Sequence, residues 1–313
     1  MAVVIQLALL AVGFVLLVKG ADWFVEGASR VAEKFGIPQL VIGLTIVAMG
    51  TSLPEAAVSV SAALKGSAEI TIGNIVGSNI MNVLLILGIT SVITPIAVQA
   101  STVKYEIPFV IVVSAILMAL GYTDNVVGRV DGVILWALML CYLWYLLVMA
   151  KKGGGQSEET PETDKPMPVW KMLLLIVVGG VMIVVGSDVA VDAATELARI
   201  FGMSERLIGL TIVAFGTSLP ELVTSATAAI KGKADIAVGN IVGSNIFNIL
   251  FVVGTSALIT PVAYAANFFV DSIVCIATAI LLWVLVARNK RLGRAGGAVM
   301  LVCYVGYFVY LMR

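Results

Sequence analysis

Long apolar runs separated by short polar gaps dominate the chain. A membrane-spanning helix needs about 20 consecutive apolar residues, and ten runs approach that length. The first run could also be the apolar part of a signal peptide, but it has no basic leader and no small-residue cleavage site. We therefore expect an all-α polytopic membrane protein with ten transmembrane helices, near residues 2–19, 39–64, 70–93, 105–122, 129–149, 169–190, 206–230, 236–259, 267–287 and 294–312.

One polar gap is longer than the others and divides the chain. Residues 151–167 are rich in Gly, Glu, Thr and Pro, a composition typical of a flexible linker. The linker separates a first unit, residues 1–150, from a second unit, residues 168–313. Each unit contains five of the expected spans.

The two units are related by an internal repeat. A shift of 166 residues aligns 36–88 with 202–254 without a gap, and 32 of the 53 positions are identical. Because five crossings return the chain to the opposite side, the second repeat must enter the membrane inverted. Inverted repeats are typical of secondary transporters, whose binding site lies near the bilayer midplane between the repeats.

Composition narrows the chemistry of such a site. The chain is 60% hydrophobic and 12% charged, whereas soluble domains carry about 25% charged residues. Zero net charge argues against nucleic acid as a partner. There is no histidine, and the three cysteines lie far apart, so a metal site would use oxygen ligands, which suit hard ions such as Ca²⁺ and Na⁺. We expect no bound cofactor and a monomer in the bilayer.

The distribution of lysine and arginine predicts the orientation. With the linker in the cytoplasm, fourteen basic residues lie on that side and five on the other. This bias fits the positive-inside rule. We therefore expect a protein of the cell (inner) membrane with both termini outside.

A polar motif interrupts one apolar run in each repeat. Residues 45–55 and 211–221 differ only at Met49 and Phe215, and both contain the sequence GTSLPE. Glu55 and Glu221 are the only charged side chains well inside the four most similar spans, and an intramembrane carboxylate is costly and usually functional. The preceding prolines should break each helix and free carbonyls near residues 48–50 and 214–216. A simple kink, with Thr and Ser bonded to their own helix, is the alternative.

A second motif follows in each repeat, GNIVGSN with a further asparagine three residues later. Ser78 and Asn82 share one helix face, as do Ser244 and Asn248. These four side chains could be ion ligands or could join helices by hydrogen bonds, whereas the glycines favour close helix packing. Asp22 and Asp188 lie near the ends of their expected spans, where we expect interfacial anchors or caps.

With both motifs present twice, the chain resembles the sodium/calcium exchanger family over nearly its whole length. The resemblance implies Na⁺/Ca²⁺ antiport by alternating access, in which the first and sixth helices slide across a core formed by the second, third, seventh and eighth. The ligands that it implies are side chains of both repeats and the main-chain carbonyls of two alanines: Thr51, Ser52, Glu55, Ser78, Asn82, Thr217, Ser218, Glu221, Ser244, Ala48 and Ala214.

One position departs from the family pattern. Asn248 stands where well-known members have an aspartate, so the site holds two carboxylates and not three. Two negative charges balance one Ca²⁺ or two Na⁺, although the neutral amide can still bind Na⁺. A proton/calcium exchanger on the same fold is the nearest alternative, since a desolvated carboxylate binds protons readily. A cation channel is less favoured. An intramembrane enzyme is not expected, because no nucleophile with an activating base accompanies the carboxylates.

Overall fold

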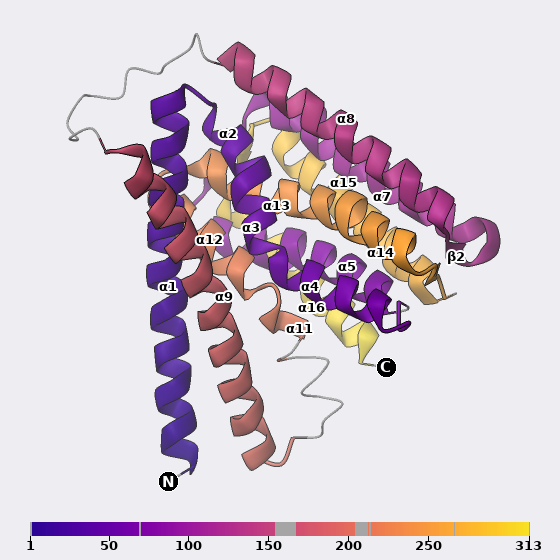
Figure 1. Ribbon diagram of the computed structural model, residues 1–313, viewed down its shortest axis with the longest axis horizontal. Coiled ribbons are helices and arrows are strands. Elements are labelled where there is room, and N and C mark those ends of the chain that lie inside the picture. Colours follow the sequence, from indigo (N-terminus) through magenta and orange to yellow (C-terminus); the bar gives the residue numbers. More distant parts are fainter. Residues whose placement is uncertain are drawn as a thin grey trace.

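Two long helices stand together at one flank of the protein (Figure 1). The computed structural model describes residues 2–68, 70–153, 167–203, 212, 214–265 and 267–312. Helices α1 (Ala2–Phe35) and α9 (Val169–Ile200) pack along each other through glycines. A Cβ atom on Gly20 would lie 2.8 Å from the Gly179 carbonyl oxygen, and one on Gly186 would lie 2.8 Å from the Gly13 carbonyl oxygen. The backbones therefore touch, and we call these two helices the α1–α9 pair.

Both helices are longer than the expected spans 2–19 and 169–190. The charged residues that suggested an end at Lys19 lie on further helical turns, where Arg30 Nε bonds Glu26 Oε1 at 2.9 Å. Such pairs four residues apart stabilise a helix that continues. Asp22 and Asp188 consequently lie inside these helices, and the expectation that they cap helix ends is wrong.

The expected break at the GTSLPE motif is present. Helix α2 (Gln39–Ile42), the π-helix η1 (Gly43–Val47) and α3 (Ala48–Thr51) run together up to Ser52, and α4 (Leu53–Leu64) continues after a bend of 51°. Pro54 lies in the first turn of α4, where a missing N–H group costs nothing. At the second copy of the motif, the described elements are α11 (Ala214–Gly216) and α12 (Leu219–Ile230).

The helices that follow are buried at the centre of the molecule and recur at the same spacing. Helix α5 (Ile70–Met81), η2 (Asn82–Leu87) and α6 (Gly88–Ile93) correspond, at a shift of 166, to α13 (Ala234–Phe247), η5 (Asn248–Val253) and α14 (Gly254–Ile259). Both η2 and η5 begin at an asparagine of the GNIVGSN motif region, Asn82 and Asn248. In the most apolar 18-residue stretch of Ala234–Ile259, 94% of the residues are buried, which keeps its polar side chains from lipid.

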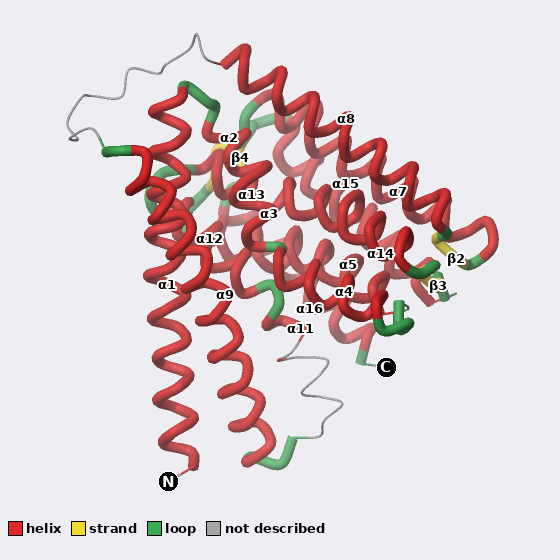
Figure 2. The backbone as a smooth tube through the Cα atoms, in the orientation of Figure 1, coloured by secondary structure: helices red, strands yellow, loops and turns green. Residues whose placement is uncertain are grey.

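Four outer helices and two short strand pairs complete the fold. The outer segments are α7 (Ile107–Asp124), which continues the π-helix η3 (Thr102–Glu106), α8 (Arg129–Gly153), α15 (Asn267–Ala287) and α16 (Arg294–Leu311). Strand β1 (Ile96–Ala97) pairs with β4 (Arg291–Leu292), and β2 (Val126–Val127) pairs with β3 (Val262–Ala263), both antiparallel. Figure 2 shows β4 near α2 and, well apart from it, β2 and β3 near the end of α8; each strand pair joins one half to the other.

The helices account for most of the expected spans. In the described part of the chain, eight helices are long and apolar enough to cross a membrane, and the bent segment Gln39–Leu64 is a ninth candidate. The beginning of the span expected at 206–230, residues 206–211 and 213, lies outside the described residues, as does most of the linker. Helix α8 continues to Gly153, so the expected linker begins within a helix.

Candidate ion-binding site

The two motif carboxylates are buried at the centre of the fold. Glu55 lies in the first turn of α4 and Glu221 in the first turn of α12, and both side chains are 0% exposed. A helix N-terminus favours a negative charge because its N–H groups point toward it. Each helix break therefore places one carboxylate where the local backbone stabilises it.

Each carboxylate is contacted by a hydroxyl group from the other half. Ser52 donates to Glu221 Oε1 at 2.8 Å, and Ser218 donates to Glu55 Oε1 at 3.5 Å. Ser78 of α5 also donates to Glu55 Oε1 at 3.5 Å. The two copies of GTSLPE, 166 residues apart, thus meet at one place.

The remaining expected hydroxyl ligands lie around the same place, in several environments. Thr51 Oγ1 donates to Asn240 Oδ1 at 2.9 Å and lies 3.1 Å from its own helix at the Val47 carbonyl, so the bond within the helix that was the alternative is also present. Ser244 donates to the Ala48 carbonyl at 3.3 Å. Thr217 is half-buried beside Ser218, and Ala214 begins α11.

One detail of the predicted helix break is wrong. The Ala48 carbonyl keeps its helical partner, since Ser52 N–H donates to it at 3.1 Å. It also accepts the Ser244 hydroxyl, so it is already doubly bonded. In the second half the equivalent Ser218 N–H donates instead to Phe215, at 3.2 Å, and the two breaks are not identical.

Asparagine side chains also join the two halves. Asn82 Nδ2 donates to Asn245 Oδ1 at 3.0 Å, and Asn248 Nδ2 donates to Asn79 Oδ1 at 3.1 Å. Asn79 and Asn245 also bond each other's backbone carbonyls, at 3.1 and 3.3 Å. The amides therefore join the two central helices, as the packing alternative proposed, and each NH₂ group donates one hydrogen bond to the other half.

Among the described residues, four buried oxygen atoms at this centre have no hydrogen-bond partner. They are the second carboxylate oxygens, Glu55 Oε2 and Glu221 Oε2, and the amide oxygens, Asn82 Oδ1 and Asn248 Oδ1. The two pairs correspond at the shift of 166. A buried acceptor without a partner costs free energy. Oxygen atoms of this kind are the ligands that hard cations take.

Two pairs of asparagines were missed by the sequence analysis. Asn74 Nδ2 bonds the Glu55 backbone carbonyl at 3.2 Å and Ser59 Oγ at 2.9 Å, and Asn240 makes the same contacts to Glu221 and Ser225 at 3.4 and 2.9 Å. They hold the carboxylate helices against α5 and α13. Their presence in both copies of the GNIVGSN motif was a signal, as it was for Asn79 and Asn245.

Comparisons with known proteins agree with this arrangement. The family model described as sodium/calcium exchanger protein matches residues 5–148 and 171–313. The putative antiporter CaxA of Alkalimonas amylolytica is 40% identical over 304 residues, covering 95% of both chains. The inner membrane protein YrbG of Escherichia coli (strain K12) is 40% identical over 309 residues, covering 94% of this chain and 92% of that protein. The solved structure of the sodium-calcium exchanger NCX_Mj superposes with a TM-score of 0.83 at 34% identity, covering 97% of both chains.

The fold and these matches place the protein in the class of cation/Ca²⁺ antiporters. The chain belongs to the sodium/calcium exchanger family. It is therefore a multi-pass membrane transporter with the fold of NCX_Mj, and the resemblance drawn from the two motifs is confirmed.

Proposed function

We propose that the protein exchanges Na⁺ for Ca²⁺ across the cell (inner) membrane by alternating access to one central site. The four unpartnered oxygens carry this proposal, because they are the acceptors that a transported cation would use. The ligand set consists of the two carboxylates, the surrounding hydroxyl and amide oxygens, and two main-chain carbonyls: Glu55, Glu221, Thr51, Ser52, Ser78, Asn82, Thr217, Ser218, Ser244, Asn248, Ala48 and Ala214.

Charge decides how the ions share the site. Glu55 and Glu221 supply two negative charges, and Asn248 adds none. One Ca²⁺ or two Na⁺ neutralise the site, so binding of one species excludes the other. Ca²⁺ is favoured over Mg²⁺ because a flexible set of many oxygens suits the larger ion, whereas Mg²⁺ demands tight octahedral geometry.

The proposed topology is ten helices in two inverted repeats, residues 1–150 and 168–313. The linker, 151–167, lies in the cytoplasm and both termini lie outside, in a monomer. Hydrogen bonds that recur at a shift of 166 support two equivalent halves: Ser52 with Glu221 against Ser218 with Glu55, and Asn82 with Asn245 against Asn248 with Asn79. An inverted relation allows one set of contacts to open toward each side in turn.

Transport by proteoliposomes tests the proposal. A Na⁺ gradient should drive ⁴⁵Ca²⁺ uptake, and Glu55→Gln or Glu221→Gln should each reduce it to background, since each removes half of the site's charge while keeping its shape. Glu106→Gln is the matched control, because Glu106 is also buried, 1% exposed, but bonds Tyr145 away from the site. Uptake that survives both central substitutions would contradict the assignment.

The same vesicles separate the two coupling ions. Uptake should stop when the Na⁺ gradient is collapsed and a pH gradient is kept. Uptake that continues under the pH gradient alone would identify a proton/calcium exchanger on this fold. Flux that needs neither gradient of a counter-ion would indicate a channel.

A further inference from the structure

An ion pair ties the central helices to α1 of the α1–α9 pair. Lys231, which follows the last turn of α12, places Nζ 2.6 Å from Asp22 Oδ1 and 3.0 Å from the Asp22 carbonyl oxygen. Glu26 Oε2 lies 3.9 Å from the same Nζ. We call this group of Lys231, Asp22 and Glu26 the first latch.

The repeat contains an equivalent set of charges. At the shift of 166, Lys231 corresponds to Lys65, Asp22 to Asp188 and Glu26 to Asp192. Lys65 follows the last turn of α4 as Lys231 follows that of α12, and the next residue in both loops is a left-handed glycine, with φ of +77° and +74°. The sequence thus provides a lysine and two acidic residues for a second latch.

The second set is not assembled in this structure. Lys65, Asp188 and Asp192 are all exposed, and within the described ranges no ion pair joins them. Helix α12 packs closely on α1, whereas α4 makes no comparable contact with α9 and runs away from the α1–α9 pair (Figure 1). The two halves therefore stand in different positions relative to the pair.

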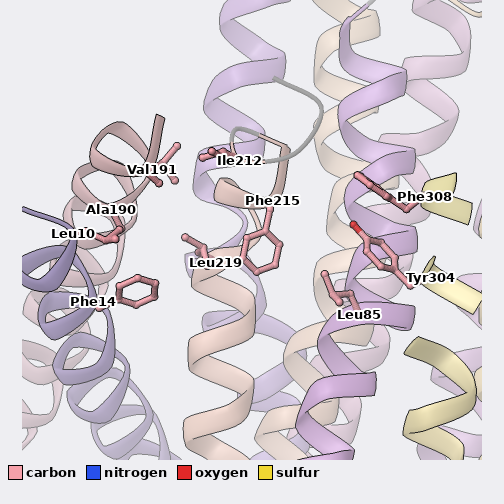
Figure 3. Close-up of a pocket in the computed structure, with 11 residues that line it drawn as sticks. Leu10, Phe14, Leu85, Ala190, Val191, Ile212, Phe215, Leu219, Tyr304 and Phe308 are labelled. Carbon is pink, nitrogen blue, oxygen red and sulfur yellow. The ribbon is translucent and has the colours of Figure 1, made fainter. Parts of the chain in front are cut away.

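An apolar pocket lies between the α1–α9 pair and the central helices near the unpaired acids, beside a contact in which the Ser187 hydroxyl of α9 donates to the Gly216 carbonyl of α11 at 2.9 Å. It has a volume of about 420 Å³, and Val191, between Asp188 and Asp192, lines it from α9. Phe215, Leu85 and Tyr304 line it from the other side (Figure 3). Val25, the equivalent of Val191 on α1, is 0% exposed, so the corresponding surface at the first latch is closed.

We propose that Lys65 forms a second latch with Asp188 and Asp192 when the first latch opens, and that the two latches hold the two end states of transport. The inference rests on the proposed alternating access. Because α1 and α9 touch through their backbones and move together, one rigid displacement closes the pocket beside Val191 and separates Asp22 from Lys231. Partly exposed ion pairs are weak, so each latch biases its state without trapping it.

Cross-linking of the full-length protein in proteoliposomes tests the exchange. Exposed Cys141 and Cys303 are first replaced by Ala, and buried Cys275 is kept. One variant carries Asp22→Cys with Lys231→Cys, a second carries Asp188→Cys with Lys65→Cys, and a control carries Asp188→Cys with Lys104→Cys. A short bifunctional methanethiosulfonate should join both latch pairs but not the control pair, and either cross-link should stop ⁴⁵Ca²⁺ flux until it is reduced.

The yield of the Lys65–Asp188 cross-link should depend on the first latch. Adding Asp22→Asn should raise the Lys65–Asp188 cross-link by about twofold to fivefold, the weight of one exposed ion pair. A Lys65–Asp188 yield no higher than the control, in protein whose first latch cross-links, would overturn the proposal. A charge swap in the chain with native cysteines gives a second test. Lys65→Asp or Asp188→Lys alone should slow ⁴⁵Ca²⁺ flux, and the two changes together should restore it. A double variant as slow as the single variants would also overturn the proposal. Cross-linking is measured without flux, so alternating cross-links with no Na⁺-driven uptake would refute only the proposed function.

Discussion

Adjacent glycines of α9 provide a sharp test of how the α1–α9 pair is packed. A Cβ atom on Gly179 would lie 2.6 Å from the Phe24 amide nitrogen and 2.7 Å from the Gly20 carbonyl oxygen. These are backbone atoms of α1, which cannot rotate away. On the next residue, Gly180, a Cβ atom would lie 3.7 Å from the Phe24 ring, an ordinary contact. Gly179→Ala should therefore destabilise the protein, and Gly180→Ala should not.

The magnitude follows from comparing the two variants. Both gain about 1 kcal/mol of helix propensity, which cancels in the difference. Restoring a 3.4 Å contact at Gly179 requires the helices to separate by roughly 0.8 Å (3.4 − 2.6). Overpacking of this kind costs about 1–3 kcal/mol. Since 1 kcal/mol shifts the melting temperature of a domain of 150–250 residues by about 2–4 °C, Gly179→Ala should melt several degrees below Gly180→Ala.

Thermal unfolding of the purified protein in detergent, followed by tryptophan fluorescence and by loss of the monodisperse elution peak, measures this difference. Wild type and Gly180→Ala should unfold at similar temperatures, with the variant equal or slightly higher. Equal melting temperatures for Gly179→Ala and Gly180→Ala would refute the backbone contact between α1 and α9. The rigid movement of the pair would then lose its support.

Two further substitutions address the site. Ser52→Ala removes the 2.8 Å hydrogen bond to Glu221 and one proposed ligand; since hydrogen bonds to charged groups contribute about 1.5–3 kcal/mol, Ca²⁺ affinity should fall roughly tenfold or more. Calorimetric titration checks this, with Ser61→Ala on the exposed face of α4 as the control, and unchanged affinity would remove Ser52 from the site. Asn248→Asp replaces the N–H group that bonds Asn79 Oδ1 at 3.1 Å and brings the site to three negative charges. The variant should exchange one more Na⁺ per Ca²⁺ than the wild type, so its transport cycle should carry net charge. A membrane potential set with valinomycin should then alter ⁴⁵Ca²⁺ flux in the variant and not in the wild type. The same response in both would contradict the charge count.

The sequence was most informative where a polar residue interrupts an apolar run. Glu55 after Pro54 predicted both a broken helix and a functional carboxylate, because each is costly in a membrane and both recur at Glu221. The 51° bend and the meeting of the two motifs agree with that prediction. The same reasoning failed beyond Lys19, since charges such as Glu26 and Arg30 can pair with each other on a helix that continues.

Other features depend on contacts that a hydrophobic pattern does not record. The segments that begin at Asn82 and Asn248 are π-helices, which differ from α-helices in the spacing of their backbone hydrogen bonds. Their side chains are as apolar as those of the neighbouring α-helices, so the sequence pattern does not reveal the difference. The crossed bonds of Asn79 and Asn245 depend on the relative placement of distant helices. The pairing of Lys231 but not Lys65 depends on the conformational state, which two matching sequence copies cannot indicate.

Anomalous diffraction from crystals soaked in Sr²⁺ tests the central claim most directly. Sr²⁺ takes the place of Ca²⁺ among hard oxygen ligands and scatters anomalously. We predict one strong peak bound by both Glu55 and Glu221, within reach of the Asn82 and Asn248 amide oxygens, and no such peak in the Glu55→Gln, Glu221→Gln double variant. A peak held by one carboxylate alone, or bound ions found only at the surface, would contradict a shared cation site.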